Sequence, residues 1–149
     1  KAIERYKAWD SPAPSFKVKD YKGTNISLNH LHGDWIILYF WSPKSVWSLN
    51  GLIEIEKLSR RYDQLVIVCL CCYGTKKDWE DVVKNIMPMS NIHNVLLNKK
   101  SKLYRDYHVR MFPTLILINP EGNIIELHNG LIDSMIIRSL ESLIPSPSS

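Results

Sequence analysis

The side chains best suited to redox chemistry in this chain are three cysteines that lie together, Cys69, Cys71 and Cys72. A thiolate attacks disulfides, whereas a thiol buried among apolar groups is inert. The apolar run that begins at Leu65 and reaches these cysteines predicts a buried strand, in which alternation places Cys69 and Cys71 on one face and Cys72 on the other. We expect Cys69 to lie in the core. Cys71 and Cys72 are expected to be partly exposed near the strand end, where a thiol could react.

Apolar periodicity and turn residues predict the elements that position these thiols. The predicted strands span residues 16–19, 25–28, 35–41, 65–71, 95–97, 114–118 and 124–127. The predicted helices span residues 48–62, from the cap Thr75 to Pro88, 103–107, and from Asp133 or Ser134 to 143. Strand, helix and strand in this order form a parallel crossover, and the final hairpin adds antiparallel strands. The sequence therefore predicts an α/β fold with a central mixed β-sheet, helices on both faces and an N-terminal β-hairpin extension.

One domain accounts for most of the 149 residues. Residues 12–144 form this predicted domain. Residues 1–11 carry apolar side chains at three-residue spacing and can form a short helix, while 145–149 contain only Pro and Ser and are expected to be disordered. The chain starts at Lys1 without Met or a signal-like segment, which is consistent with a trimmed domain whose targeting sequence is absent.

Composition excludes several function classes. The net charge of +4 comes from Lys and Arg scattered along the chain, whereas a nucleic-acid binder gathers them on one face, so we expect no nucleic-acid partner. No apolar run approaches the roughly 20 residues that span a bilayer, and we expect no transmembrane segment. The histidines lack Cys or carboxylate neighbours at ligand spacing, and no Gly-rich phosphate loop is present. We therefore expect surface histidines, no metal site and no cofactor.

Several short motifs, in order, resemble a known family. They are Pro12-Ala13-Pro14-Ser15-Phe16, Phe40-Trp41, Phe112-Pro113-Thr114 and Asn119-Pro120-Glu121-Gly122. From Pro12 to about Leu143 the chain resembles the thioredoxin superfamily, specifically its TlpA-like thiol:disulfide interchange and AhpC/TSA-type branch. The resemblance implies a thioredoxin-like fold, a cis bond before Pro113, and a groove there that receives an extended substrate.

The chain departs from this family at the redox site. The family carries Cys-x-x-Cys where its first core strand meets a helix, and the matching residues here are Ser45-Val46-Trp47-Ser48. Both the mixed disulfide and the product disulfide of the exchange reaction are S–S bonds, which a serine hydroxyl cannot form. The resemblance thus implies that Ser45 and Ser48 replace the dithiol and that ordinary dithiol oxidoreductase activity is absent. Lys44 also differs from the family pattern, which favours natural divergence over experimental replacement.

These observations lead to one expected function and two alternatives. We expect a redox-inactive thioredoxin-like domain that binds a peptide or protein partner at the former active-site groove. The alternatives are a thiol oxidoreductase or peroxide-reducing enzyme that uses Cys71 or Cys72, and a domain that stabilises the thiolate of a cosubstrate at Ser45, as glutathione transferases do.

The expected binding residues surround the serine site. Trp41 occupies a family position beside the site, and Phe112 and Pro113 form the expected groove. Trp47 stands between the two serines, where it is expected either to be exposed as a contact residue or to fold over the site. The resemblance also suggests a location in the bacterial periplasm or cell envelope.

Overall fold

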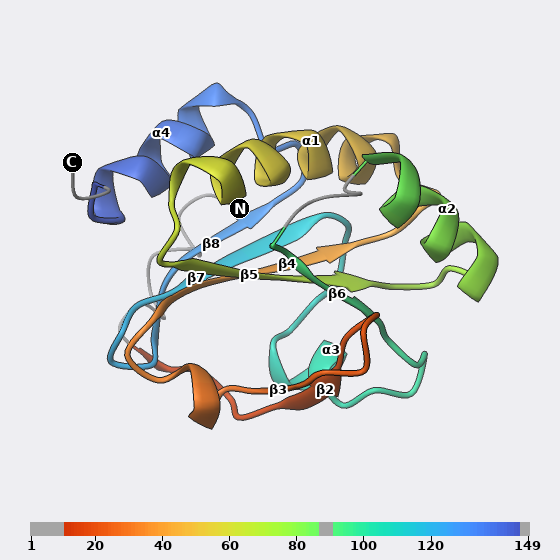
Figure 1. Cartoon of the computed structure of the whole chain (residues 1–149), viewed down its shortest axis with the longest axis horizontal. Helices are drawn as coiled ribbons and strands as arrows, with labels where there is room; N and C mark the ends of the chain where they lie inside the picture. The colour runs from red at the N-terminus through yellow and green to blue at the C-terminus, as the bar shows by residue number, and fades with distance from the viewer. Residues whose placement is uncertain (1–10, 87–90, 147–149) are drawn as a thin grey trace.

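A six-stranded mixed sheet organises the residues that the computed structural model describes, 11–86 and 91–146 (Figure 1). The strands are β1 (Ser11–Pro12), β2 (Lys17–Lys19), β3 (Asn25–Ser27), β4 (Trp35–Trp41), β5 (Leu65–Cys71), β6 (His93–Leu96), β7 (Thr114–Ile118) and β8 (Asn123–Asn129). The helices are α1 (Val46–Arg61), α2 (Lys76–Ile86), α3 (Leu103–Asp106) and α4 (Ser134–Leu143), with a 3-10 turn at Asn29–Leu31. Strands β2 and β3 form a separate antiparallel hairpin.

The strand order β1-β8-β7-β4-β5-β6 confirms the predicted mixed sheet. Strands β4 and β5 are parallel, with α1 between them in the chain, and β5 and β6 are parallel across α2. Strands β7 and β8 form the expected antiparallel hairpin. Because Trp41 pairs with Cys71, the C-terminal ends of β4 and β5 lie side by side at the edge of the sheet from which α1 starts.

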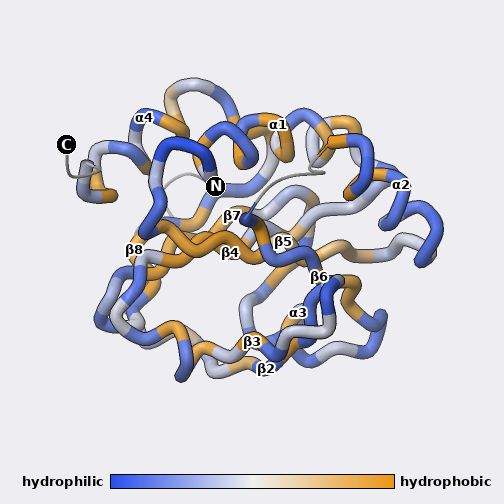
Figure 2. Tube along the Cα trace, in the orientation of Figure 1, coloured by the Kyte–Doolittle hydropathy of each residue, from blue (hydrophilic) through white to orange (hydrophobic). Residues whose placement is uncertain are grey.

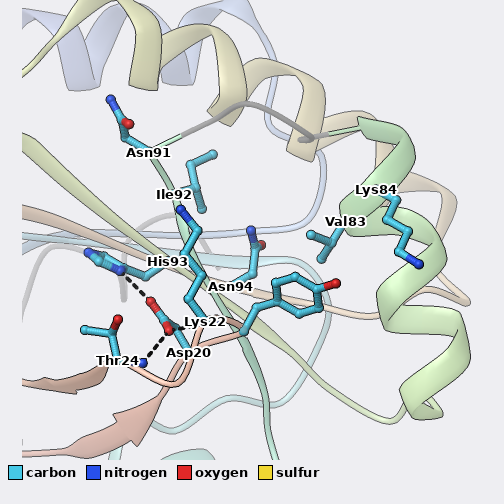
Figure 3. Close-up of a pocket in the computed structure, with 10 residues that line it drawn as sticks. Asp20, Lys22, Thr24, Val83, Lys84, Asn91, Ile92, His93 and Asn94 are labelled. Carbon is cyan, nitrogen blue, oxygen red and sulfur yellow. Dashed lines mark hydrogen bonds and ion pairs between the residues drawn. The ribbon is translucent and has the colours of Figure 1, made fainter.

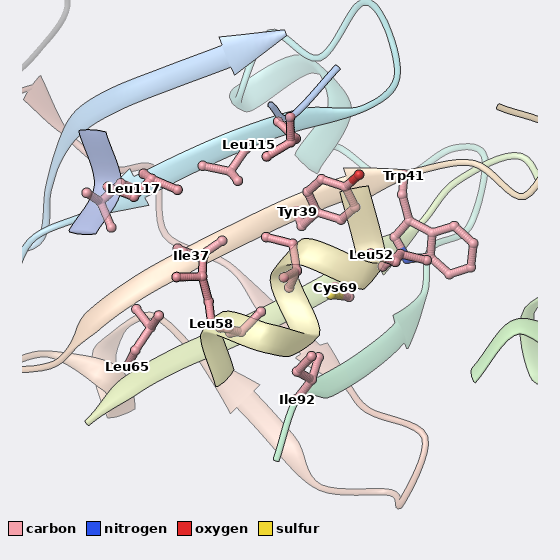
Figure 4. Packing of buried hydrophobic residues seen from close by; sticks show 14 of the residues in the cluster. Ile37, Tyr39, Trp41, Leu52, Leu58, Leu65, Cys69, Ile92, Leu115 and Leu117 are labelled. Atoms are coloured by element: carbon pink, nitrogen blue, oxygen red, sulfur yellow. The ribbon is translucent and has the colours of Figure 1, made fainter. Parts of the chain in front are cut away.

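Both faces of the sheet are covered, as predicted. On one face α1, α2 and α4 pack over alternate residues of β4, among them Ile37 and Tyr39 (Figures 1 and 4). On the other face the β2–β3 hairpin and α3 cover Ile36 and Leu38. Figure 2 shows the resulting concentration of hydrophobic residues along the central strands. The continuous apolar sequence of β4 is thus explained by burial on both sides.

A close contact fixes the first turns of α1 against β4. The buried hydroxyl of Tyr39 donates a hydrogen bond of 2.9 Å to the backbone carbonyl of Ser48. Gly51 makes this approach possible, because a Cβ at that position would overlap the Tyr39 hydroxyl and lie 2.9 Å from Cζ of the same ring. The glycine in the middle of this helix is therefore required by packing, despite its low helix propensity.

The element boundaries differ from the prediction in a few places. Helix α1 begins at Val46, two residues before the predicted start, because Ser45 is its N-cap. Strand β6 begins at His93, two residues early, and the short strand β1 on β8 was not predicted. The predicted caps are confirmed: Thr75 accepts from the N–H of Asp78, and Asp133 from that of Ile136. The predicted N-terminal helix, the stop at Pro88 and residues 147–149 of the predicted tail lie outside the described residues.

Candidate functional site

Ser45 stands at the start of α1, where the chain leaves β4. Its backbone is extended, and its side-chain oxygen accepts a hydrogen bond of 3.1 Å from the backbone N–H of Ser48. Its own N–H donates to the carbonyl of Ser42, which closes the preceding turn. This half-buried hydroxyl therefore lies at the positive dipole end of α1 and caps the helix.

Ser48 has a different environment. Its side chain has no exposed surface, and its oxygen accepts a hydrogen bond of 3.2 Å from the backbone N–H of Ser42. Its carbonyl accepts from Tyr39. Ser48 therefore stabilises the turn between β4 and α1 from its buried side, while Ser45 lies on the side nearer the surface.

The loop before β7 lies against Ser45. The Ser45 hydroxyl donates a hydrogen bond of 3.4 Å to the carbonyl oxygen of Phe112, and the Phe112–Pro113 bond is cis, as expected. Two further hydrogen bonds hold this loop: the Thr114 hydroxyl donates to the carbonyl of Met111, and the Gly130 N–H to that of Pro113. The predicted neighbours Ser45, Phe112 and Pro113 are therefore brought together.

Exposed apolar side chains surround this contact, and we call Tyr73, Trp47, Met111 and Phe112 the apolar rim. Trp47, Tyr73 and Met111 are 52%, 47% and 42% exposed. A Cβ on Gly130 would lie 3.6 Å from the Trp47 ring and 3.9 Å from the Met111 methyl group, so both side chains lie beside that glycine. The rings of Tyr73 and Phe112 form a T-shaped pair with a centroid distance of 5.6 Å. Adjoining half-exposed apolar side chains of this kind are typical of contact surfaces.

Trp41 occupies a different place from the other candidate binding residues. It has no exposed surface and packs in the core beneath α1 and α2. Trp41 therefore packs in the core under the site and is not part of its exposed surface.

The three cysteines alternate between the two faces as predicted, and Cys69 lies in the core as expected, but the predicted partial exposure of Cys71 and Cys72 is wrong. All three are free thiols without exposed surface. The reason is packing over both faces of the sheet: Cys71 lies in the core cluster beneath α1 and α2, and Cys72 lies in the cluster on the opposite face, so other side chains cover both thiols at the end of β5. Burial raises the pKa of Cys71 and of Cys72 to about 12 and that of Cys69 as well.

The histidine prediction also needs correction. His93 lies 2.9 Å from a carboxylate oxygen of Asp20, and the buried His128 lies 2.6 Å from one of Glu126. His93 lies on β6 and Asp20 in the turn after β2, so the spacing of residues along the chain could not reveal this pair. Glu126 and His128 both lie on β8. No cluster of three metal-binding side chains occurs within residues 11–86 and 91–146. The helices in these ranges are also too short or too polar to cross a membrane.

The sequence pattern did not identify two residues of the apolar rim, Tyr73 and Met111, as candidate binding residues. Tyr73 follows the end of β5 with a positive φ of 56°, and its ring stacks on Tyr104. Met111 directly precedes the Phe112-Pro113 pair. Their place beside these predicted features is the signal that could have identified them.

Solved structures define the class of this fold. The thioredoxin domain of a thiol-disulfide oxidoreductase from Bacteroides vulgatus superposes with a TM-score of 0.75 at 23% identity, covering 93% of this chain and 99% of that one. A thiol-disulfide oxidoreductase from Bacteroides fragilis also gives 0.75 at 19% identity, covering 90% and 100%. The fold is therefore thioredoxin-like.

Sequence relatives place the chain within a family. The AhpC/TSA family model matches residues 10–127, and the chain belongs to this family, in its TlpA-like thiol:disulfide oxidoreductase branch. Thioredoxin-like protein YneN of Bacillus subtilis is 27% identical over 119 residues, covering 79% of this chain and 69% of the relative. Thiol-disulfide oxidoreductase ResA of the same organism is 28% identical over 139 residues, covering 90% and 74%.

Proposed function

We propose that this chain is a redox-inactive thioredoxin-like domain that binds an extended apolar segment of a partner protein at the apolar rim. The observation that carries the proposal is the place of Ser45. Its hydroxyl lies at the start of α1 and contacts Phe112 beside the cis bond, where the family resemblance implies a cysteine. The scaffold of a thiol site is thus combined with a group that cannot form a disulfide.

The chemistry of the remaining cysteines supports the inactive reading. A thiol with a pKa of about 12 is almost entirely protonated near neutral pH, and Cys71 and Cys72 combine such a pKa with complete burial. A substrate disulfide could reach neither sulfur without local opening of the structure around the end of β5. The alternative of a thiol enzyme that uses Cys71 or Cys72 is therefore disfavoured.

The apolar rim supplies the binding argument. Burial of apolar surface contributes roughly 25 cal/mol per Å², and a large aromatic side chain at an interface is often among its strongest contacts. Trp47 is half exposed, and it and Met111 lie beside the same glycine, Gly130. An extended segment that crosses the rim would cover both side chains together with Phe112.

A location in the bacterial periplasm or cell envelope belongs to the same proposal. Its support is the resemblance to the TlpA-like branch, and it is tested by fractionation of cells that express the full-length protein. Recovery only from the cytoplasm would contradict this part and leave the binding proposal in place.

The redox part is tested by insulin reduction with dithiothreitol as electron source. We expect no turnover above a reaction without protein. Turnover that is lost in Cys71→Ser or Cys72→Ser would replace the proposal with the thiol-enzyme alternative.

The binding part is tested by selection from a random peptide-display library. We expect enriched apolar peptides whose affinity falls about tenfold in Trp47→Ala, which corresponds to about 1.4 kcal/mol. Ile53→Ala is the matched control, because Ile53 lies on the same helix and is 45% exposed but is not part of the rim. Equal binding by Trp47→Ala, or no enrichment over an unrelated domain, would contradict the proposal.

A further inference from the structure

Two exposed cations adjoin the contact between Ser45 and Phe112, at the centre of the proposed partner-binding site. Lys44 directly precedes Ser45, and Arg110 directly precedes Met111. Because consecutive Cα atoms are about 3.8 Å apart, the Cα of each cation lies next to a residue of the site. The hydrogen bond from Ser45 to Phe112 joins the two segments that carry these cations, the turn into α1 and the loop before β7. Each of these segments therefore supplies one positive charge.

Neither cation is neutralised by a neighbour. Lys44 and Arg110 form no ion pair with any residue that the structure describes. Several exposed cations of α1 and α2, in contrast, pair with carboxylates of α1, α2 or α4; these cations are Lys57, Arg60, Arg61 and Lys77. Because Lys44 and Arg110 have no such partner, a carboxylate of another molecule can pair with them without breaking an existing ion pair.

The segments that form the site contain no acidic residue. They are residues 42–48, 73–75, 108–113 and 129–131, and their side chains that carry or can gain positive charge are Lys44, His108 and Arg110. The first turn of α1 contains no acidic residue either, whereas that of α2 contains Asp78. The site itself thus supplies no carboxylate for a cationic partner.

The acidic residues nearest to these segments in the chain do not reverse this balance. Glu126 is largely buried, and the side chain of Asp133 caps α4. Asp106 lines a separate cavity beside β2, together with two lysines. Asp78 is then the remaining carboxylate, one negative charge against two positive ones. Positive charge therefore predominates around the apolar rim.

This charge discriminates between partners that apolar contact alone would accept. A segment with Lys or Arg beside its apolar anchor would bring like charges together, which disfavours binding. A segment with Asp or Glu in that place would be attracted by both cations, over a distance of roughly 8 Å at physiological ionic strength. Attraction of this kind also accelerates the encounter of the two molecules. An acidic segment is therefore the electrostatic complement of the site.

We propose that the segment bound at the apolar rim carries aspartate or glutamate beside its apolar anchor. The anchor covers Trp47 and Met111, and the carboxylates approach Lys44 and Arg110. This inference rests on the proposed function, because it names the chemistry of the partner that binds the same surface.

Two peptide-display libraries with the same randomised apolar core test the charge of the partner. The core is flanked on both sides by aspartates in one library and by asparagines, which have nearly the same shape but no charge, in the other. We expect aspartate-flanked peptides to dominate a mixed selection against the whole chain. Exchange of their aspartates for asparagines should lower the affinity about fivefold at low salt, mainly through slower association. The difference should shrink at high salt.

The outcomes separate this inference from the proposed function. Equal enrichment of the two libraries, or an affinity difference that salt does not change, would overturn the inference and leave apolar binding at the rim in place. Enrichment of neither library would contradict the proposed function and this inference with it.

Reversal of both charges tests the two residues. Lys44→Glu with Arg110→Glu should abolish the preference for aspartate-flanked peptides, because the added carboxylates repel them. Asparagine-flanked peptides should bind within about twofold of wild type, since the apolar rim is unchanged. Arg110→Gln adds no charge and should reduce the preference in part. Retention of the full preference in the double variant would overturn the assignment to these residues.

The control is Lys22→Glu with Lys84→Glu, which changes the net charge equally. Both residues are exposed and line a cavity of about 640 Å³ at the edge strand β6. No residue of the apolar rim lines that cavity, and Figure 3 shows the Lys22 and Lys84 side chains pointing away from each other. This variant should keep the preference for aspartate-flanked peptides. An equal loss in the control would show that net charge alone determines binding, and would overturn the proposal.

Discussion

The hydroxyl of Ser45 donates a hydrogen bond to the carbonyl oxygen of Phe112, with 3.4 Å between the two oxygens. The bond connects the start of α1 to the loop before β7, which lie 67 residues apart in the chain. The same hydroxyl accepts from the N–H of Ser48, so it serves as helix cap and as inter-element contact together. A capping side chain of this kind typically stabilises by about 1 kcal/mol. Ser45 thus has a structural role that does not require a reactive group.

The native protein should resist thiol reagents. Cys69, Cys71 and Cys72 are fully buried with raised pKa values, so none presents a thiolate at pH 8. We expect less than about a tenth of the thiols to react with Ellman's reagent within minutes, and all three to react at once in guanidinium chloride. Rapid reaction of one thiol in the native state would show that the end of β5 opens.

The comparison of β5 with its prediction shows which properties are local. Alternation assigns Cys69 and Cys71 to one face and Cys72 to the other, because side-chain direction in a strand depends only on position along it. The exposure of these residues depends on what packs over the two faces of the sheet at the end of β5, and core side chains from other elements cover both faces there. A sequence pattern within β5 contains no information on that covering.

The candidate site and its surroundings also combine features that the local sequence predicts with features that depend on residues far apart in the chain. The N-cap position of Ser45 and the proximity of Phe112 follow from the strand–helix order and the family resemblance. The pairing of Asp20 with His93 joins residues 73 positions apart through a hairpin turn and an edge strand, and no local spacing indicates it. Asn94 precedes the apolar run of residues 95–97 from which the strand was predicted, so the sequence does not show that the strand begins at His93 and buries a polar side chain.

Gly51→Ala should destabilise the protein by about 2 kcal/mol or more, as expected when atoms are forced into a packed core. The new methyl group would overlap the Tyr39 hydroxyl and displace its hydrogen bond to Ser48. A Gly→Ala change at an exposed helix position stabilises a protein by up to about 1 kcal/mol. The sign of the change in unfolding free energy therefore distinguishes a steric overlap with Tyr39 from the ordinary effect of helix propensity. Urea unfolding measures the difference. Asn50→Ala, at the exposed neighbouring position, is the control and should change stability by less than about 0.5 kcal/mol.

Asp20→Asn should lower stability in a pH-dependent manner. Burial raises the pKa of Asp20, but hydrogen bonds from His93 and from the N–H groups of Thr24 and Lys22 outweigh it and leave the pKa below its usual value. A carboxyl group whose pKa is lower in the folded protein stabilises the fold at pH values above its pKa in the unfolded chain, which is near 4. This contribution is lost as the pH falls through the pKa of the carboxyl group in the folded protein.

We therefore expect wild type to exceed Asp20→Asn by about 2 kcal/mol at pH 7, with a difference that shrinks below about pH 4. The measurement is urea unfolding of both proteins across this range. Asp63→Asn, which changes an exposed carboxylate, controls for net charge. A difference that is constant with pH would show that the effect comes from packing of the turn and not from the ionised carboxylate.

Ser45→Cys with Ser48→Cys should create a reactive pair if only the sulfur atoms have been lost. A thiolate at position 45 would lie at the N-terminus of α1 and accept the N–H of residue 48, so we expect its pKa to fall below the free-cysteine value of about 8.5. Position 48 follows across the first helical turn, a spacing that allows closure to a disulfide, although its buried side chain makes that sulfur the less accessible one. The alkylation rate against pH gives the pKa. The parent protein and the two single variants are controls, and the native thiols should contribute little because they are buried. A normal pKa at position 45 together with no disulfide on oxidation would show that the start of the helix has diverged with its cysteines.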